Sequence, residues 1–156
     1  MAGGVERFSS LLTPGVVFPG LSALDRDGVI TEMVGGLRER FPGHDWGGVE
    51  NTLMRREMMG STAIGDFAAI PHARWNGGFF GAIGVSGPGI EFHSLDGKKA
   101  YVVFLLLSPP GKAGEHLKLL AGISRLAREA GVWEGIKTAG SAEEILSIIH
   151  SVDRKS

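Results

Sequence analysis

Apolar residues recur at helical spacing in the stretch that follows Asp27. Their positions repeat every three or four residues, as on the buried face of a helix: Val29, Ile30, Met33, Val34, Leu37 and Phe41. Asp25 or Asp27 can cap the beginning of this helix, and Pro42 with Gly43 ends it.

A second helix is expected to begin after Asp45, whose carboxylate can cap it. Val49 and Leu53 lie one turn apart on its inner face, and Gly60 follows its end, where glycine commonly terminates a helix. Arg56 falls in the last turn, where the helix dipole favours a cation. From position alone, the simplest interpretation of Arg56 is a charge that stabilises the helix end.

A third apolar stripe begins at His116 and continues along one helical face: Leu119, Leu120, Ile123, Leu126, Ala127 and Ala130. Because His116 heads this stripe, its side chain is expected to point inward in the first turn, where free N–H groups favour an anion. Two interpretations stay open: His116 either caps the core or helps to bind an anion. A last helix is expected at the capping box formed by Ser141 and Glu144.

Runs of apolar residues predict the strands. Residues 79–85 and 90–95 are expected to be strands, and Asp96 followed by Gly97 signals a hairpin into residues 101–107. That last run, YVVFLLL, is apolar on both faces, which is typical of a central strand covered by helices on each side. No stretch marks a domain boundary. The sequence therefore predicts one α/β domain over residues 1–156, a three-layer α/β/α sandwich with a mixed sheet of roughly five strands.

A histidine directly after a proline ends one more apolar run. Residues 67–70 are expected to form a strand that stops at Pro71, because proline has no N–H to donate. His72 is then presented on a rigid loop at a strand end, where binding and catalytic side chains are common. Trp75 follows closely, and it fits either an exposed aromatic that meets a partner or a packed core residue.

Charge balance and cysteine content exclude several functions. Sixteen basic against seventeen acidic residues give a net charge of −1, so neither nucleic-acid binding nor a polybasic membrane patch is expected. The longest apolar run, residues 101–107, is too short to span a bilayer. Residues 1–5 lack the features of a secretory signal. The absence of cysteine excludes disulfides and thiolate metal sites. We therefore expect a cytoplasmic protein.

Other catalytic and metal motifs are not matched. Residues 84–88, GVSGP, lack the last glycine of a nucleophile elbow, and Gly111 with Lys112 lacks the rest of a phosphate-binding P-loop. No HExxH motif occurs, and the five histidines are far apart in sequence. A zinc site shared by His72 and His116 would require that the two meet in space. No metal and no other cofactor is expected.

Two motifs resemble the active site of enzyme IIA of the bacterial phosphotransferase system, in the fructose/mannitol class. They are REMMGSTAIGDFAAIPHAR, residues 56–74, and GEHLKLLAGISRL, residues 114–126. In that family an Arg-Glu pair lies sixteen residues before an A-I-P-H histidine, as Arg56 lies before His72, and a second histidine begins a leucine-rich helix, as His116 does. The similarity covers residues 8–145. The chain departs from the family's usual glycine and bulky aliphatic residue at Phe67 and Ala68.

The resemblance implies that His72 carries a phosphoryl group and that Arg56 and His116 converge on it. Neutral imidazole is a competent nucleophile at cytoplasmic pH because its ordinary pKa is about 6.5. A loose transition state spreads negative charge over the phosphoryl oxygens, and Arg56 and His116 are suited to donate to them. This chemistry requires no metal. The sequence does not identify the group that sets the tautomer of His72.

The resemblance also implies the partners. An HPr-type phosphocarrier protein, or its nitrogen-branch relative, would donate the phosphoryl group. The favoured hypothesis is a regulatory protein of the nitrogen-regulatory type, which binds other cytosolic proteins according to its phosphorylation state, because no IIB, IIC or carrier domain is fused to this chain. The alternative is a IIA subunit that passes the group to a separate IIB subunit for fructose- or mannitol-type sugar uptake. A relative without phosphoryl transfer is disfavoured by the intact Arg56, His72 and His116.

The surface around His72 is expected to be open, because the phosphoryl group arrives from one protein and leaves to another through the same histidine. Such transient encounters favour a modest apolar patch over a deep pocket. Trp75, Phe79 and Phe80 are the candidates for its rim, although the two phenylalanines also fit the start of a buried strand.

Overall fold

A computed structural model describes residues 7–64 and 67–153 of the chain. The expectation about residues 1–5, and the part of the first motif at Gly65 and Asp66, lie outside the described residues. Within the described ranges the strands are β1 (Val17–Phe18), β2 (Ala63–Ile64), β3 (Ala68–Ala69), β4 (His72–Arg74), β5 (Phe80–Ile90) and β6 (Ala100–Ser108). They form one sheet in the order β1-β5-β6-β3-β2, with β4 also paired to β6.

The sheet is mixed, as the sequence predicts. β5 and β6 are antiparallel, whereas β1 runs parallel to β5, and both β3 and β4 run parallel to β6. β6 is the central strand, and its residues Val102, Val103, Phe104, Leu105, Leu106 and Leu107 are completely buried. The prediction of a central strand covered on both faces is therefore confirmed.

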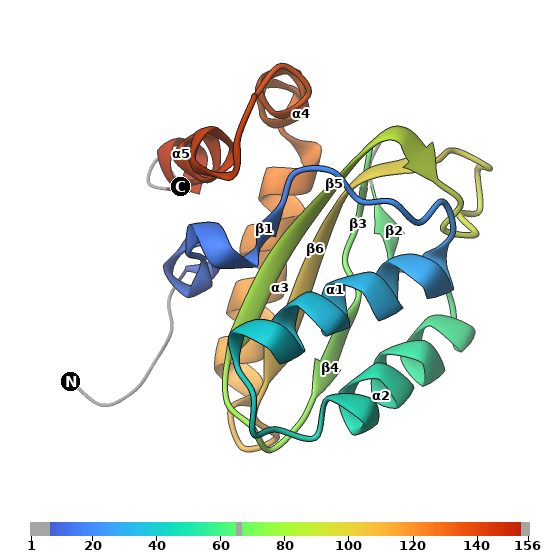
Figure 1. The fold of residues 1–156 in the computed structure, drawn as a ribbon, viewed down its shortest axis with the longest axis vertical. Helices are drawn as coiled ribbons and strands as arrows, with labels where there is room; N and C mark the ends of the chain where they lie inside the picture. Colours follow the sequence, from blue (N-terminus) through green and yellow to red (C-terminus); the bar gives the residue numbers. More distant parts are fainter. Residues whose placement is uncertain (1–6, 65–66, 154–156) are drawn as a thin grey trace.

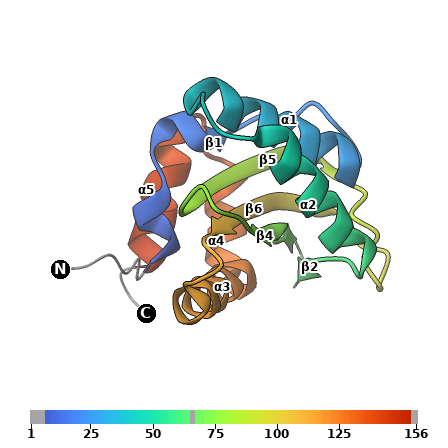
Figure 2. The same cartoon turned by 90° about the horizontal axis from the view of Figure 1, so that it is seen from below.

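Helices cover both faces of this sheet (Figures 1 and 2). The helices are the two 3₁₀ turns η1 (Phe8–Leu11) and η2 (Pro14–Val16), then α1 (Arg26–Arg40), α2 (Trp46–Met58), α3 (Ala113–Arg128), α4 (Ala130–Ile136) and α5 (Ala142–Asp153). Figure 2 shows α1 and α2 on one side of the sheet and α3 on the other, with α5 beside β1. The three-layer α/β/α sandwich is thus confirmed.

Side-chain caps fix where the first two long helices begin. The carboxylate of Asp25 accepts a hydrogen bond from the Gly28 N–H at 2.8 Å, and that of Asp45 accepts from the Gly48 N–H at 3.0 Å. Each cap satisfies one of the N–H groups that a helix leaves unpaired at its start. Of the two candidates for the first helix, Asp25 is therefore the cap.

Two boundaries differ from the prediction. β5 is one strand through Ile90 with a bulge between Val85 and Ile90, so the separate strand expected at residues 90–95 is wrong. Gly89, with φ +91°, lets the chain pass through this bulge. The long stripe also stops early: α3 ends at Arg128 because Glu129 is extended, and Ala130 begins α4 with an exposed side chain.

Pro71 interrupts the strand without ending its pairing to the sheet. β3 stops at Ala69, yet the Pro71 carbonyl accepts a hydrogen bond from the Leu106 N–H at 3.1 Å, and β4 continues along β6 from His72. Proline has no N–H to donate to a neighbouring strand, but its carbonyl can still accept a hydrogen bond. The prediction that His72 lies on a loop is therefore wrong: His72 opens a short strand, where the sheet fixes its backbone.

Candidate functional site

His72 is half-buried, and its ring is held by the main chain two residues earlier. Its Nδ1 lies 2.7 Å from the Ile70 carbonyl oxygen. A carbonyl can only accept, so Nδ1 carries the proton in the neutral ring and Nε2 keeps its lone pair. Burial lowers the pKa of His72, the Ile70 bond opposes this, and the positive charge of Arg56 lowers the pKa again. Near pH 7 the ring is therefore neutral, and Nε2 is the nitrogen that keeps a lone pair.

His116 lies directly beside His72. The two ring centroids are 5.7 Å apart, and the His116 side chain is 7% exposed, so it points inward as predicted. Its Nδ1 is hydrogen-bonded to the hydroxyl of Ser108, which is completely buried at the end of β6. Burial, followed by repulsion from His72 when that ring is protonated and from the guanidinium of Arg74, lowers the pKa of His116 to about 4. His116 is therefore neutral near pH 7.

Arg56 lies half-buried in the last turn of α2, and its positive charge adds to burial in lowering the pKa of His72. Its Nη1 donates to the carbonyl oxygen of Gly60 at 3.1 Å, so the guanidinium is held against the turn that follows the helix. Three elements thus supply the three predicted site residues: α2, β4 and α3.

Arg74 and Ser108 are neighbours of the site that sequence reasoning missed. Arg74 follows His72 by two residues in β4, and this spacing, which places two side chains on one face of a strand, was the available signal. Its Nη2 donates to the Pro109 carbonyl at 3.0 Å and also to that of Pro110, which holds the segment leading into α3. Ser108 gave no signal in the sequence, because its bond to His116 forms only once the end of β6 and the first turn of α3 are brought together by the fold.

Comparison with known proteins identifies the family. Residues 10–152 match the family described as phosphoenolpyruvate-dependent sugar phosphotransferase system, EIIA 2. The chain belongs to this family. All three predicted site residues fall inside the matched part of the EIIA domain.

Relatives of this EIIA chain include proteins of both kinds named by the two hypotheses. A nitrogen regulatory protein of Bradyrhizobium diazoefficiens is 32% identical over 143 residues, which is 90% of this chain and 93% of that protein. The fructose-specific EIIABC component of Bacillus subtilis is 30% identical over 150 residues, 95% of this chain but 24% of that protein.

Solved structures share the fold. The crystal structure of nitrogen regulatory protein IIA-Ntr from Neisseria meningitidis superposes with a TM-score of 0.82 at 28% identity, over 90% of this chain and 97% of that one. The IIA mannitol protein of Escherichia coli, in complex with phosphorylated enzyme IIB, gives a TM-score of 0.70 at 16% identity, over 90% of this chain and 97% of that one. This second likeness concerns the fold alone.

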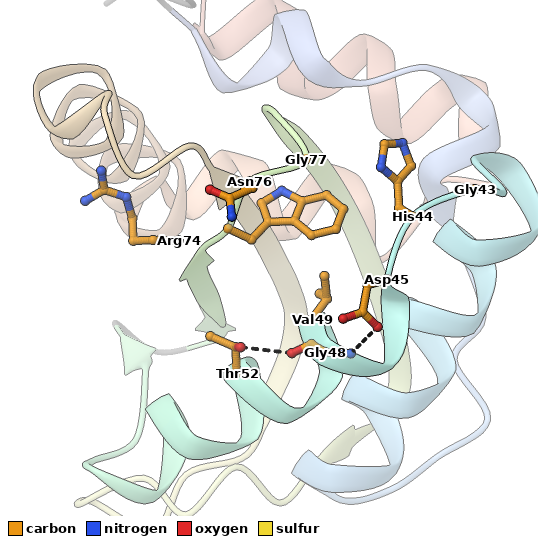
Figure 3. A pocket seen from close by; sticks show the side chains of 10 residues that line it. Gly43, His44, Asp45, Gly48, Val49, Thr52, Arg74, Asn76 and Gly77 are labelled. Atoms are coloured by element: carbon orange, nitrogen blue, oxygen red, sulfur yellow. Dashed lines mark hydrogen bonds between the residues drawn. The ribbon is translucent and has the colours of Figure 1, made fainter.

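A separate pocket of about 490 Å³ lies between the start of α2 and the β4–β5 turn (Figure 3). It is lined by Gly43, His44, Asp45, Gly48, Val49, Thr52, Arg74, Trp75, Asn76 and Gly77. His72, His116 and Arg56 do not line it. Asp45 places its carboxylate at the start of α2, where it caps the helix, so the lining of this pocket contains one carboxylate together with the guanidinium of Arg74.

Trp75 packs into an aromatic cluster and is not exposed on the rim of the site. Its ring centroid lies 5.0 Å from that of Trp46 and 5.6 Å from that of Phe80, and its Nε1 donates to the Gly78 carbonyl at 2.9 Å. Trp75, Phe79 and Phe80 are all half-buried. Of the two interpretations of Trp75, the structure supports the packed residue, because the β4–β5 turn folds the ring back over α2.

The described residues contain no group of three or more His, Cys, Asp or Glu side chains that could hold a metal ion. His72 and His116 do meet, but Nδ1 of each is already hydrogen-bonded, to Ile70 and Ser108. Among the described helices, none combines the length and the apolar character needed to cross a membrane.

Proposed function

We propose that Nε2 of His72 accepts a phosphoryl group from an HPr-type phosphocarrier protein. The observation that carries the proposal is the bond from Nδ1–H to the Ile70 carbonyl, which leaves the Nε2 lone pair free. In the transfer, this lone pair forms the new N–P bond while the bond from phosphorus to the carrier breaks, and its electron pair stays with the carrier. The proposal treats residues 1–156 as one EIIA domain that acts in the cytoplasm.

The neighbours of His72 are suited to stabilise the transferred group. The transition state is loose and spreads negative charge over the phosphoryl oxygens, so positioned donors are the main requirement. Arg56 supplies a guanidinium. Neutral His116 carries a proton on one of its two ring nitrogens, so it supplies one N–H donor. Arg74 adds a second positive charge, which acts on His116. In this proposal, the imidazole of His72 is the nucleophile, and Arg56 and His116 bind the oxygens.

We further propose that the protein is of the nitrogen-regulatory type, in which phosphorylation of His72 changes binding to other cytosolic proteins. Support comes from the Bradyrhizobium nitrogen regulatory protein, which matches along 93% of its length, and from the IIA-Ntr structure with TM-score 0.82. The second candidate is a IIA subunit that passes the group to a separate IIB subunit, as the similarity to the fructose-specific EIIABC component suggests. Mixing the phosphorylated protein with purified fructose- and mannitol-type IIB subunits separates the two: rapid loss of the label to IIB supports the second candidate.

The test of phosphoryl acceptance uses phosphoenolpyruvate, enzyme I and the phosphocarrier. One acid-labile phosphoryl group per chain is expected, and His72→Ala should carry none. His150→Ala is the matched control, because His150 lies on α5 and contributes nothing to the site. Undiminished labelling of His72→Ala would falsify the proposal.

A further inference from the structure

A continuous series of hydrogen bonds connects the end of α2 to the ring of His72. The carboxylate of Glu57 accepts from the Thr62 N–H at 3.2 Å and from the Thr62 hydroxyl. The Thr62 carbonyl accepts from the Ile70 N–H at 3.1 Å. The Ile70 carbonyl accepts from Nδ1 of His72 at 2.7 Å. Every link in this series is a direct contact.

The strand pairing explains why the series is unbroken. β2 and β3 are antiparallel, with Ala63 opposite Ala69 and Ile64 opposite Ala68, so Thr62 falls opposite Ile70. The Ile70 peptide therefore uses its N–H toward Thr62 and its carbonyl toward His72. A displacement of Thr62 would move the same peptide that holds the histidine ring.

Glu57 is a buried carboxyl group, with 2% of its side chain exposed. Burial raises its pKa, and the two bonds from Thr62, with the charges of Arg26 and Arg56, oppose this. A carboxyl group removed from water is costly unless it is hydrogen-bonded, so Thr62 cannot leave without a large penalty. Arg56 binds the Gly60 carbonyl in the same turn, so two successive residues of α2 hold the segment between α2 and β2.

We propose that Glu57 is a positioning residue: through Thr62 it fixes the Ile70 peptide, which keeps the proton of His72 on Nδ1 and the lone pair on Nε2. The effect on phosphoryl transfer rests on the function proposed above, whereas the effect on the tautomer does not. When the Ile70 carbonyl is not fixed, the ring can turn and carry its proton on Nε2, and that form has no lone pair to offer at the reacting atom.

The experiment compares Glu57→Ala with Glu57→Gln in the full chain. Nitrogen-15 NMR of the histidine ring reports the tautomer of His72 without any partner protein, and the rate of labelling by the phosphorylated carrier reports function. In Glu57→Ala we expect a mixed tautomer and labelling slower by about 10-fold, as is typical when a residue that orients a functional histidine is lost. Glu57→Gln should keep the wild-type tautomer and labelling rate, because its amide oxygen accepts from the Thr62 N–H and its amide group donates to the Thr62 hydroxyl.

Two further variants keep the proposal testable if Glu57→Ala does not fold. Thr62→Val removes the hydroxyl link and should shift the tautomer in the same direction. Ser86→Ala is the control: it removes a buried hydrogen bond to Gly89 within β5, and β5 and β4 lie on opposite sides of β6. This variant should leave the tautomer of His72 unchanged.

The outcomes separate the two proposals. If the tautomer of His72 is unchanged in both Glu57→Ala and Thr62→Val, the positioning role is overturned, even if labelling slows. It is also overturned if Ser86→Ala shifts the tautomer of His72 as much as these variants do. If the wild-type protein accepts no phosphoryl group at all, the proposed function fails, while the NMR comparison still decides the role of Glu57.

Discussion

The imidazole rings of His72 and His116 lie with their centroids 5.7 Å apart and their planes tilted by 50°. Both rings depend on the end of β6: His72 is paired in register with Leu106, and His116 is bonded to Ser108. In each ring the Nδ1 atom is occupied, by Ile70 or by Ser108. The Nε2 atoms are therefore the ring nitrogens that remain for the phosphoryl group proposed above.

The first prediction concerns the protonation of His72. Burial and the charge of Arg56 lower its pKa, so the ring should stay neutral below the pH at which a free histidine becomes protonated. An NMR titration should give a midpoint for His72 below about 6.5. The rate of phosphoryl acceptance should fall at acid pH around the same midpoint, because the protonated ring has no lone pair. A midpoint above the ordinary value would contradict this electrostatic description of the site.

The second prediction concerns stability and His116. Its pKa is about 4 in the folded protein and about 6.5 in the unfolded chain, so the unfolded state binds more protons between these values. The contribution of His116 to stability is therefore complete above pH 6.5 and is lost as the pH falls toward 4. One proton gives a slope of up to about 1.4 kcal/mol per pH unit in the free energy of unfolding.

Urea unfolding of wild type and His116→Gln at pH 7, 6 and 5 measures this difference. The pKa values of His72 and Glu57 are shifted in opposite directions, and both residues are present in both proteins. Because His72 acts electrostatically on His116, its titration midpoint is measured by NMR in both proteins and included in the comparison. Between pH 6 and pH 5 the wild type should lose about 1 kcal/mol more than the variant. Parallel pH profiles would show that His116 takes up its proton equally in both states.

Sequence reasoning reached the fold through local patterns, whereas the three proposed site residues came from the resemblance to the EIIA family. The caps at Asp25 and Asp45 and the central strand are encoded within a few residues, and the structure has them where the sequence predicts them. The group that sets the tautomer of His72 could not be predicted, because it is the carbonyl of Ile70, and every residue has a carbonyl. Its orientation depends on two backbone hydrogen bonds between distant segments: Ile70 donates to Thr62, and Pro71 accepts from Leu106 in β6.

The aromatic residue at position 67 shows how tertiary contacts compensate for an unusual local sequence. Phe67 stands where the family pattern described in the sequence analysis has glycine; it is 5% exposed and stacks on Trp133 with ring centroids 6.0 Å apart. Its carbonyl accepts from the N–H groups of Tyr101 and Val102, so the start of β3 stays attached to β6. The partner helix α4 supplies the surface that the larger ring needs.

The third prediction follows from this packing. Phe67→Ala should lower the free energy of unfolding by about 3 kcal/mol, as is typical when a buried phenylalanine is truncated and a cavity remains. Phe67→Leu, which refills most of that volume, should cost about 1 kcal/mol. Denaturant unfolding measures both. Equal and small losses in the two variants would show that Trp133 and Phe67 do not stabilise each other.

The fourth prediction concerns the surface that meets the phosphocarrier. Trp75 is packed away, so other apolar side chains must meet the carrier. Three large exposed ones follow site residues in the sequence: Met58, Met59 and Leu117. Leu117 directly follows His116 and is 67% exposed. Leu117 lies in the first turns of α3 and directly follows His116, whose ring lies beside that of His72. A carrier that reaches Nε2 of His72 is therefore expected to cover Leu117.

Leu117→Glu should slow phosphoryl exchange with the carrier about fivefold or more, as expected when a contact worth over about 1 kcal/mol is lost from an interface. Its free energy of unfolding should change by less than about 0.5 kcal/mol, because the side chain is exposed. Leu95→Glu is the matched control: Leu95 is fully exposed in the loop before β6, whereas His72 pairs near the far end of that strand. Exchange rates of both variants with one phosphorylated carrier decide the point. Equal rates would place the docking surface elsewhere, and slowing in both would indicate a general effect of added negative charge on the encounter.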